Sequence, residues 1–139
     1  MTSRHPLQTN GNEAYDIQPE INEAVTESGV QEGLVTIVAP HTTAALGIIS
    51  YHDPLGLEDV MDEFQRLVPA RITFKHEHDT PQDAAGHVLS TMVGPTLTLI
   101  VTGGEVLLGH SQKVFFLEFD GPRKRQFFVK VTADPTPEA

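Results

Sequence analysis

The chain has 139 residues, a formal net charge of −10 with the histidines neutral, and no cysteine. This length predicts a single domain with a sizeable buried core. Hydrophobic residues make up 39% and charged residues 20%, which is typical of a soluble globular protein. Without cysteine there is no disulfide framework and no thiolate metal site, so any transition-metal site must use imidazole and carboxylate ligands.

The distribution of charged and apolar residues also limits the classes of partner that the chain is expected to bind. A net charge of −10 argues against nucleic-acid binding, because that affinity depends on Lys and Arg neutralising phosphates. The one basic cluster, Arg123–Arg125, is large enough only for a small phosphorylated ligand. No apolar run approaches the ~20 residues that span a bilayer, and the first residues resemble no signal peptide. We therefore expect no membrane partner and a cytoplasmic location.

The first half of the chain predicts an arm, a helix, two strands and a second helix. Residues 1–12 are expected to form an N-terminal arm or an edge strand. Asp16–Ser28 has apolar residues at helical spacing and is followed by a glycine that ends the helix. Leu34–Ala39 and Thr43–Ile49 predict strands. After a turn, one helical face collects apolar residues up to the stop at Pro69, namely Leu57, Val60, Met61, Phe64 and Leu67.

The second half predicts a third helix among several strands. Arg71–Asp79 predicts a strand that fades into a loop. Thr80 is a good N-cap for a helix that closes at Gly94-Pro95. Thr96–Thr102 and Glu105–Leu108 predict a hairpin that turns through Gly103-Gly104. Lys113–Phe119 and Gln126–Thr132 predict a last strand pair, and residues 133–139 predict a disordered tail. Together these elements predict an α+β fold of mainly antiparallel sheet with about three helices in one compact domain.

Three histidines are candidate metal ligands because of their positions in the predicted elements. His41 follows the strand Leu34–Ala39 and precedes two threonines, His76 lies in the loop before the third helix, and His87 lies on that helix. Neutral imidazole is the commonest protein ligand for zinc and related ions. Three imidazoles around one ion leave a fourth position open, which is the catalytic form of that geometry. A surface role for each histidine is the alternative.

Several stretches together resemble the YjbQ family (UPF0047): HTTAAL at 41–46, FKHEHD at 74–79, GHV at 86–88, MVGPTLT at 92–98 and EFDGPR at 118–123. Its members are described as secondary thiamine-phosphate synthases or are uncharacterised. The resemblance implies a YjbQ-like domain over residues 13–132 and a homotrimer. It also implies a divalent metal, expected to be zinc, because His41, His76 and His87 match the recurrent histidines of the family.

Further residues are candidates for chemistry or substrate binding, each beside a plainer interpretation. Asp53, Gln112 and Glu118 are the predicted catalytic residues, although Asp53 suits a helix cap, Gln112 a strand start, and Glu118, like Asp120, an exposed strand end. The predicted substrate-binding residues are Thr42, Thr43 and Arg123. Three more histidines are candidates for additional ligands, with an incidental role as the plainer interpretation: His52, His78 and His110.

The chain departs from the family around the predicted site. Ile49-Ser50-Tyr51 replaces a polar run, and His110-Ser111 replaces a Thr-Trp pair. We therefore expect a retained fold and metal site, with thiamine-phosphate synthase activity that is weak or diverged. The alternatives are a metal-assisted hydrolase of a small phosphorylated substrate and a protein that binds a metal or small molecule without catalysis.

Overall fold

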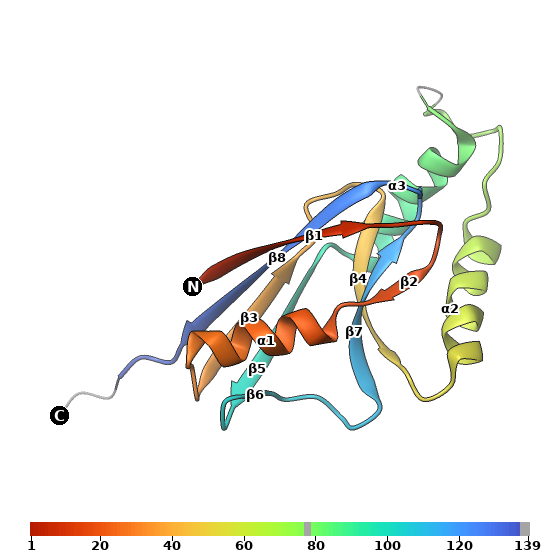
Figure 1. Ribbon diagram of the computed structural model, residues 1–139. Helices are drawn as coiled ribbons and strands as arrows, with labels where there is room; N and C mark the ends of the chain where they lie inside the picture. The colour runs from red at the N-terminus through yellow and green to blue at the C-terminus, as the bar shows by residue number, and fades with distance from the viewer. Residues whose placement is uncertain (77–78, 137–139) are drawn as a thin grey trace.

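The structure is a computed structural model that describes residues 1–76 and 79–136 (Figure 1). Along these residues the chain forms three helices and eight strands. In chain order they are β1 (Thr2–Gln8), β2 (Ala14–Asp16), α1 (Gln18–Ser28), β3 (Gly33–Val38), β4 (Ala44–Ser50), α2 (Pro54–Leu67), α3 (Pro81–Val93), β5 (Thr96–Thr102), β6 (Glu105–Val106), β7 (Gln112–Glu118) and β8 (Lys124–Ala133).

The strands form two sheets, and every pairing is antiparallel. The larger sheet has the order β1-β8-β3-β5-β6, and the smaller has the order β2-β7-β4. The β5–β6 hairpin turns through Gly103 and Gly104 at φ values of 59° and 77°, which only glycine adopts readily. This hairpin and the α+β class with three helices confirm the predictions from the sequence.

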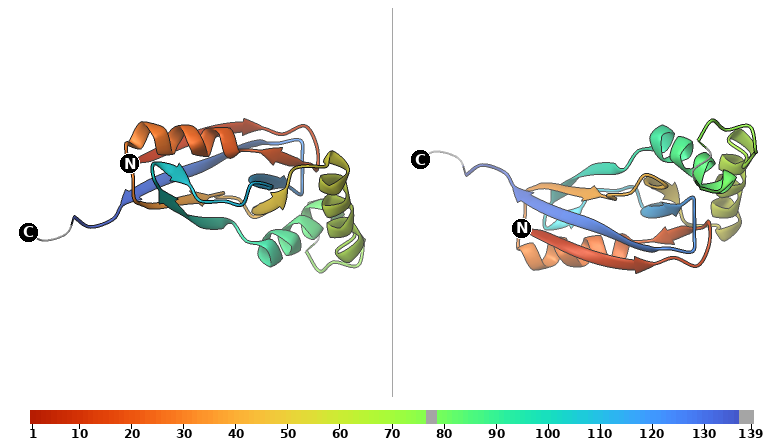
Figure 2. Two further views of the ribbon diagram at one scale, coloured as in Figure 1. Left: turned by 90° about the horizontal axis from the view of Figure 1, so that it is seen from below. Right: turned by 90° about the horizontal axis from the view of Figure 1, so that it is seen from above.

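The smaller sheet is buried on both faces. One face, with α1, packs against the inner face of the larger sheet, where Ile21, Phe116 and Val129 are among the core residues. The other face packs against α2 and α3 through residues such as Phe115, Leu117 and Leu89. Figure 2 shows α2 and α3 together at one end of the molecule. Because both of its faces are covered, β7 is an almost continuous apolar run rather than an alternating one.

The helix ends follow local chemistry that the sequence displays. Gly29 takes a left-handed conformation at φ 71° and donates its N–H to the carbonyl oxygen of Thr26, which closes α1. Asp53 accepts a hydrogen bond from the backbone of Leu55 and caps α2. Thr80 caps α3 in the same way by accepting from the backbone N–H of Asp83.

Two predictions about strands were wrong. Lys113–Phe119 and Gln126–Thr132 do contain strands, but β7 pairs with β2 and β4, and β8 pairs with β1 and β3. The short loop between them crosses from one sheet to the other instead of making a hairpin. Arg71–Asp79 contains no strand in its described residues, and Ile72 is 89% exposed there because no neighbouring strand covers it.

The chain ends are tied to the larger sheet as far as the structure describes them. β1 is an edge strand that pairs with β8 along its whole length. β8 continues to Ala133, and Asp134 donates its N–H to the carbonyl oxygen of Glu32. Of the predicted disordered tail, residues 137–139 lie outside the described residues. None of the described helices is long and apolar enough to cross a bilayer.

Candidate metal centre

Two imidazoles and one carboxylate meet at the start of α3. The Nε2 atoms of His76 and His87 each lie 3.2 Å from Oδ2 of Asp83. The two rings are nearly perpendicular, with their centroids 5.0 Å apart. One potential ligand atom from each residue falls within 4.8 Å of the others, and within the described residues this is the only such group of three or more. We call it the His–Asp–His cluster.

Local structure explains why these three side chains meet. Asp83 and His87 are four residues apart on α3, so they project from the same face of the helix. His76 comes from the preceding loop. α3 is held against β4, because Ser90 Oγ donates to the carbonyl oxygen of Ala44 at 2.7 Å. Gly86 lets the backbones approach closely, since a Cβ there would lie 3.2 Å from the carbonyl oxygen of Phe119.

The cluster opens into a pocket of about 410 Å³. This pocket contains all six residues that the sequence predicted for metal or substrate binding, His41, His76, His87, Thr42, Thr43 and Arg123. It adds Pro40, Asp79, Asp83 and Arg125. The His-Thr-Thr segment after β3 is therefore brought beside the loop and helix histidines, although it lies far from them in the sequence.

The carboxylate of the cluster, Asp83, and the neighbouring Asp120 both lie close to Arg123. Asp120 accepts from Nη2 of Arg123 at 2.6 Å, and Asp83 lies 3.9 Å from the same nitrogen. Burial opposes ionisation of Asp83, yet its hydrogen bonds with Asp120 and His76 and the nearby His87 bring its pKa below the usual value. Burial and the neighbouring Asp83 raise the pKa of Asp120, and Arg123 only partly offsets this. Asp83 is thus the more readily ionised carboxylate, as a metal ligand must be.

His41 lines the pocket but does not join the cluster. Its Nε2 lies 2.9 Å from the carbonyl oxygen and 3.1 Å from the backbone nitrogen of Gln126 on β8. Burial lowers the pKa of the ring, although the hydrogen bond with Gln126 opposes this, so the imidazole favours its neutral form. In this structure the His41 nitrogen faces a strand backbone, and its role as a metal ligand stays a prediction.

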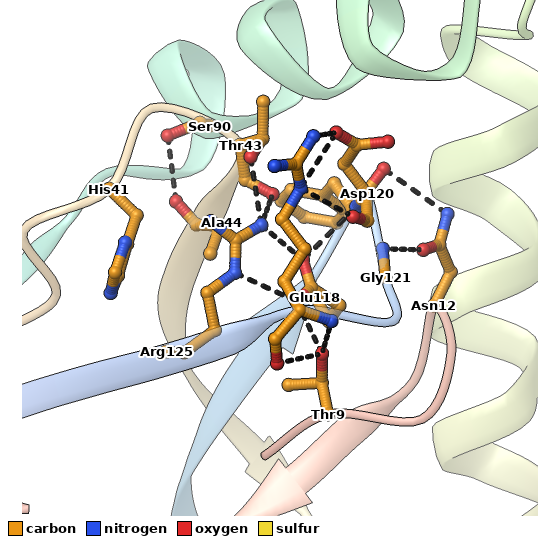
Figure 3. A network of polar contacts seen from close by, with 12 residues as sticks. Thr9, Asn12, His41, Thr43, Ala44, Ser90, Glu118, Asp120, Gly121 and Arg125 are labelled. Carbon is orange, nitrogen blue, oxygen red and sulfur yellow. Dashed lines mark hydrogen bonds and ion pairs between the residues drawn. The ribbon is translucent and has the colours of Figure 1, made fainter. Parts of the chain in front are cut away.

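A second charged group supports the wall of the pocket (Figure 3). Glu118 and Arg125 are both buried, and Nε of Arg125 donates to Oε1 of Glu118 at 2.8 Å. Glu118 also accepts from Thr9 Oγ1 at 2.7 Å and from the backbone N–H of Asp120 at 3.0 Å. Arg125 donates to Thr43 Oγ1 at 2.8 Å. We call the ion pair of Glu118 and Arg125 the Glu118–Arg125 brace.

The brace changes the interpretation of several predicted residues. Glu118 and Asp120 are buried rather than exposed at the strand end. Burial opposes ionisation of Glu118, but the hydrogen bonds from Arg125, Thr9 and Asp120 bring its pKa below the usual value. Thr43 is also buried and is held by Arg125, whereas Thr42 is exposed to the pocket. Of this pair, Thr42 is the better placed to meet a substrate.

Other predicted residues lie outside the pocket. Asp53 caps α2, as the plainer interpretation expected, and borders a separate apolar groove between β4 and α2. Gln112 accepts from the backbone N–H of Gly109 and holds a turn. His52 and His110 form a ring contact with each other, with centroids 5.6 Å apart. His78 lies outside the described residues. Catalytic roles for Asp53 and Gln112 stay predictions.

Comparison with known proteins identifies the family. The profile described as "UPF0047 protein YjbQ-like" matches residues 4–134. The chain belongs to the YjbQ-like UPF0047 family. Among the relatives of this YjbQ-like chain, the UPF0047 protein MJ1081 of Methanocaldococcus jannaschii is 38% identical over 135 residues, or 96% of each chain. YugU of Bacillus subtilis is 34% identical over 88% of this chain and 92% of its own.

Solved structures of YjbQ-like proteins have the same fold. A hypothetical protein from Aeropyrum pernix superposes with a TM-score of 0.90 at 27% identity, covering 96% of this chain and 99% of its own. A YjbQ/UPF0047 protein from Clostridium acetobutylicum gives 0.88 at 31% identity, covering 94% and 99%. The resemblance inferred from the short motifs is therefore confirmed over nearly the whole chain.

Sequence reasoning missed Asp83 as a partner of the histidines. Asp83 lies in the first turn of α3, where an acidic side chain is common without any further role. The spacing of Asp83 and His87 was a usable signal, because residues four apart share a helix face. Arg125 was seen only as part of a basic cluster, and nothing local indicated that it is buried against Glu118.

Proposed function

We propose that this YjbQ-like chain is a metal-dependent enzyme whose ion is held by His76, Asp83 and His87. One observation carries the proposal: two imidazoles and a carboxylate place ligand atoms within 4.8 Å of one another at the edge of a pocket. Two histidines and one carboxylate are a recurrent ligand set of catalytic zinc sites. The donor set therefore fits a divalent ion of the zinc type, and His41 is kept as a further candidate ligand.

We infer a small phosphorylated substrate from the groups around the cluster. A divalent ion supplies positive charge that polarises a phosphoryl oxygen. Arg123 is partly exposed at the same pocket, where it is oriented by Asp120. Its guanidinium suits planar, two-point recognition of phosphate. Thr42 adds an exposed hydroxyl to the same pocket.

The reaction we propose is of the thiamine-phosphate synthase kind that the family resemblance implies, at a reduced rate. In that reaction a thiazole nitrogen forms a bond to the pyrimidine's activated carbon as the bond from that carbon to pyrophosphate breaks. Positioning of the two substrates and charge stabilisation of the leaving pyrophosphate contribute most of the acceleration. Arg123 and Thr42 would hold the phosphate groups. The Glu118–Arg125 brace would keep the wall of the pocket rigid.

We also propose a homotrimer, as the family resemblance implies. The larger sheet ends in the edge strands β1 and β6, and open edges invite pairing or cover by another chain. Closed rotational symmetry is the usual form of such assemblies.

Metal binding tests the first part of this proposal. Zinc chloride titrated into chelator-treated protein is expected to bind at one ion per chain. His87→Ala and Asp83→Asn should weaken binding by more than the ~10–100-fold that loss of a ligand's neighbour costs. His110→Ala is the matched control, and its affinity should equal the wild type. Equal affinity in His87→Ala would overturn the proposed site. A loss in His41→Ala as large as in His87→Ala would place His41 in the ligand set.

A direct assay tests the reaction. We expect zinc-dependent formation of thiamine phosphate from the pyrimidine pyrophosphate and the thiazole phosphate. The rate should be far below that of a YjbQ-like relative that keeps the polar run before the Asp-Pro turn, because lost hydrogen-bonding groups can cost ~10⁴-fold. Equal rates would show that Ile49–Tyr51 and His110-Ser111 lie outside the working site. Pyrophosphate release without the thiazole would favour the hydrolase instead.

A further inference from the structure

An apolar groove lies between the edge of β4 and helix α2, apart from the metal centre. Its volume is about 500 Å³, and residues 47–50 of β4 form one wall. The remaining lining residues come from α2 and its cap, the end of α3, and β7: Asp53, Gly56, Val60, Phe64, Val93 and Leu117. Ile49, Val60 and Phe64 are only half-buried. A mostly apolar cavity of this size is typical of a small-molecule site.

The absence of a side chain at Gly47 keeps this groove open. Side chains alternate along β4, and Ile49 packs with Leu117 in the cluster that faces α2 and α3, so position 47 faces the same way. A Cβ at Gly47 would lie 3.2 Å from Leu117 Cδ1 and 3.7 Å from Ile49 Cγ1. A larger side chain there would therefore occupy the groove.

The edge of β4 beside the groove has unused backbone hydrogen-bonding groups. Among the described strands, β4 pairs only with β7, in an unbroken antiparallel register. Leu46 donates its N–H to the carbonyl oxygen of Gly94, on the side away from β7. Because bonded and non-bonded positions alternate along an antiparallel pair, the N–H and C=O groups of Ile48 and Ser50 point to that same side. No described residue hydrogen-bonds to them.

The free part of this edge is short. It begins after Leu46, whose N–H is already bonded to Gly94, and it ends with the strand at Ser50. From Ile48 to Ser50 the strand spans about 7 Å, at ~3.4 Å per residue. A peptide strand usually runs over ~5–6 residues. The edge therefore suits a small molecule better than an added peptide strand.

The groove has little charge. Asp53 is the one ionisable side chain among its described lining residues, and Oδ1 of Asp53 already accepts from the N–H of Leu55. The lining includes no lysine or arginine, whereas Arg123 and Arg125 line the pocket of the metal centre. A phosphate or carboxylate in the groove would lose water without gaining a counter-charge, so the groove favours an uncharged ligand.

We propose that this groove binds an uncharged aromatic heterocycle that has an amino group beside a ring nitrogen. The amino group donates to the C=O of Ile48, and the ring nitrogen accepts from the N–H of Ser50. The ring lies between the apolar walls that β4 and α2 provide. Adenine has this arrangement of donor and acceptor and is the probe. Binding in this groove does not require the metal of the His–Asp–His cluster.

Titration of adenine into the chelator-treated chain, followed by proton–nitrogen NMR, tests the site. The amide signals of Ile48 and Ser50 should shift and saturate. Purine lacks the amino group and should bind about tenfold more weakly, because the Ile48 carbonyl is left without a partner. Adenine that gives no saturable shift of these two amides would overturn the proposal. Equal affinity for purine would overturn the assigned hydrogen bonds.

Variants that fill the groove from opposite walls give a second test. Gly47→Val fills it from β4 and Val60→Trp from α2, and each should weaken adenine binding at least tenfold without changing zinc affinity. Leu67→Trp is the matched control, because Leu67 is 57% exposed on α2 and does not line the groove. Its adenine affinity should equal that of the wild type.

Two further outcomes would overturn the proposal. Adenine affinity that is unchanged in the folded Gly47→Val and Val60→Trp proteins would place adenine elsewhere on the chain. An alternating valine–threonine pentapeptide that shifts the Ile48 and Ser50 amides where adenine does not would assign the edge of β4 to a peptide strand.

Discussion

Two groups of ionisable side chains lie at the pocket, and they differ in how far they are exposed. In the Glu118–Arg125 brace both members are buried, and Glu118 accepts hydrogen bonds from Arg125, Thr9 and the Asp120 backbone. In the His–Asp–His cluster only Asp83 is buried, while the His76 and His87 side chains are 45% and 39% exposed.

This difference separates scaffold from site. A buried ion pair with all of its hydrogen bonds made has little capacity left for a ligand, and breaking it is costly. A buried carboxylate with half-exposed imidazoles keeps ligand atoms accessible from the pocket. Both groups contain ionisable side chains, and both include residues of the family motifs, so residue type alone does not tell them apart. The exposure of each side chain distinguishes the two groups.

Loss of one member of the brace should have the largest effect on stability. Glu118→Gln leaves the buried guanidinium of Arg125 without its counter-ion, which is expected to lower the free energy of unfolding by about 3–5 kcal/mol. Chemical denaturation at pH 7 measures this. Glu63→Gln is the control, because Glu63 pairs with Arg66 on the exposed face of α2 and should lose under ~1 kcal/mol. Equal losses of stability in both variants would show that the buried Glu118–Arg125 pair is worth no more than an exposed ion pair.

The brace should also make stability depend on pH in a defined direction. The pKa of Glu118 in the folded chain is below its usual value of 4.5. Its contribution is therefore present above pH 4.5 and is lost as pH falls through the folded pKa. The stability difference between wild type and Glu118→Gln should be largest near neutral pH and shrink in acid. A difference that stays constant down to acid unfolding would show that Glu118 does not carry it.

Loss of the cap on α2 should have the smallest effect on stability and should leave metal binding by the His–Asp–His cluster unchanged. Asp53→Ala removes the side-chain hydrogen bond to Leu55 and is expected to cost about 1 kcal/mol of stability. Zinc affinity should be unchanged. Paired melts and zinc titrations of this variant measure both quantities. A fall in affinity together with stability would return Asp53 to the catalytic role that the sequence predicted.

The fold was largely predictable because its elements have local signals. Caps, prolines and glycines mark the helix ends, and Gly103-Gly104 predicts the β5–β6 turn. The separation of β7 and β8 into different sheets was not predictable, because strands that are neighbours in sequence usually pair with each other. β8 pairs instead with β1 and β3, which lie far from it in the sequence.

The candidate site was predictable in its residues more than in its contacts. Histidines at a strand end, in a loop and on a helix were visible in the sequence, and the pocket contains all three. The orientation of His41 was not visible, because its partner Gln126 lies 85 residues away on β8. Burial of Glu118 against Arg125 likewise depends on two strands of different sheets.

The most direct test of the metal centre is zinc K-edge X-ray absorption on the zinc-loaded chain. We predict nitrogen and oxygen neighbours at about 2.0–2.1 Å, with multiple scattering from imidazole that falls in His87→Ala and is unchanged in His110→Ala. A spectrum without imidazole scattering, or one that is the same in His87→Ala as in the wild type, would contradict the assignment of His76, Asp83 and His87 as the ligands.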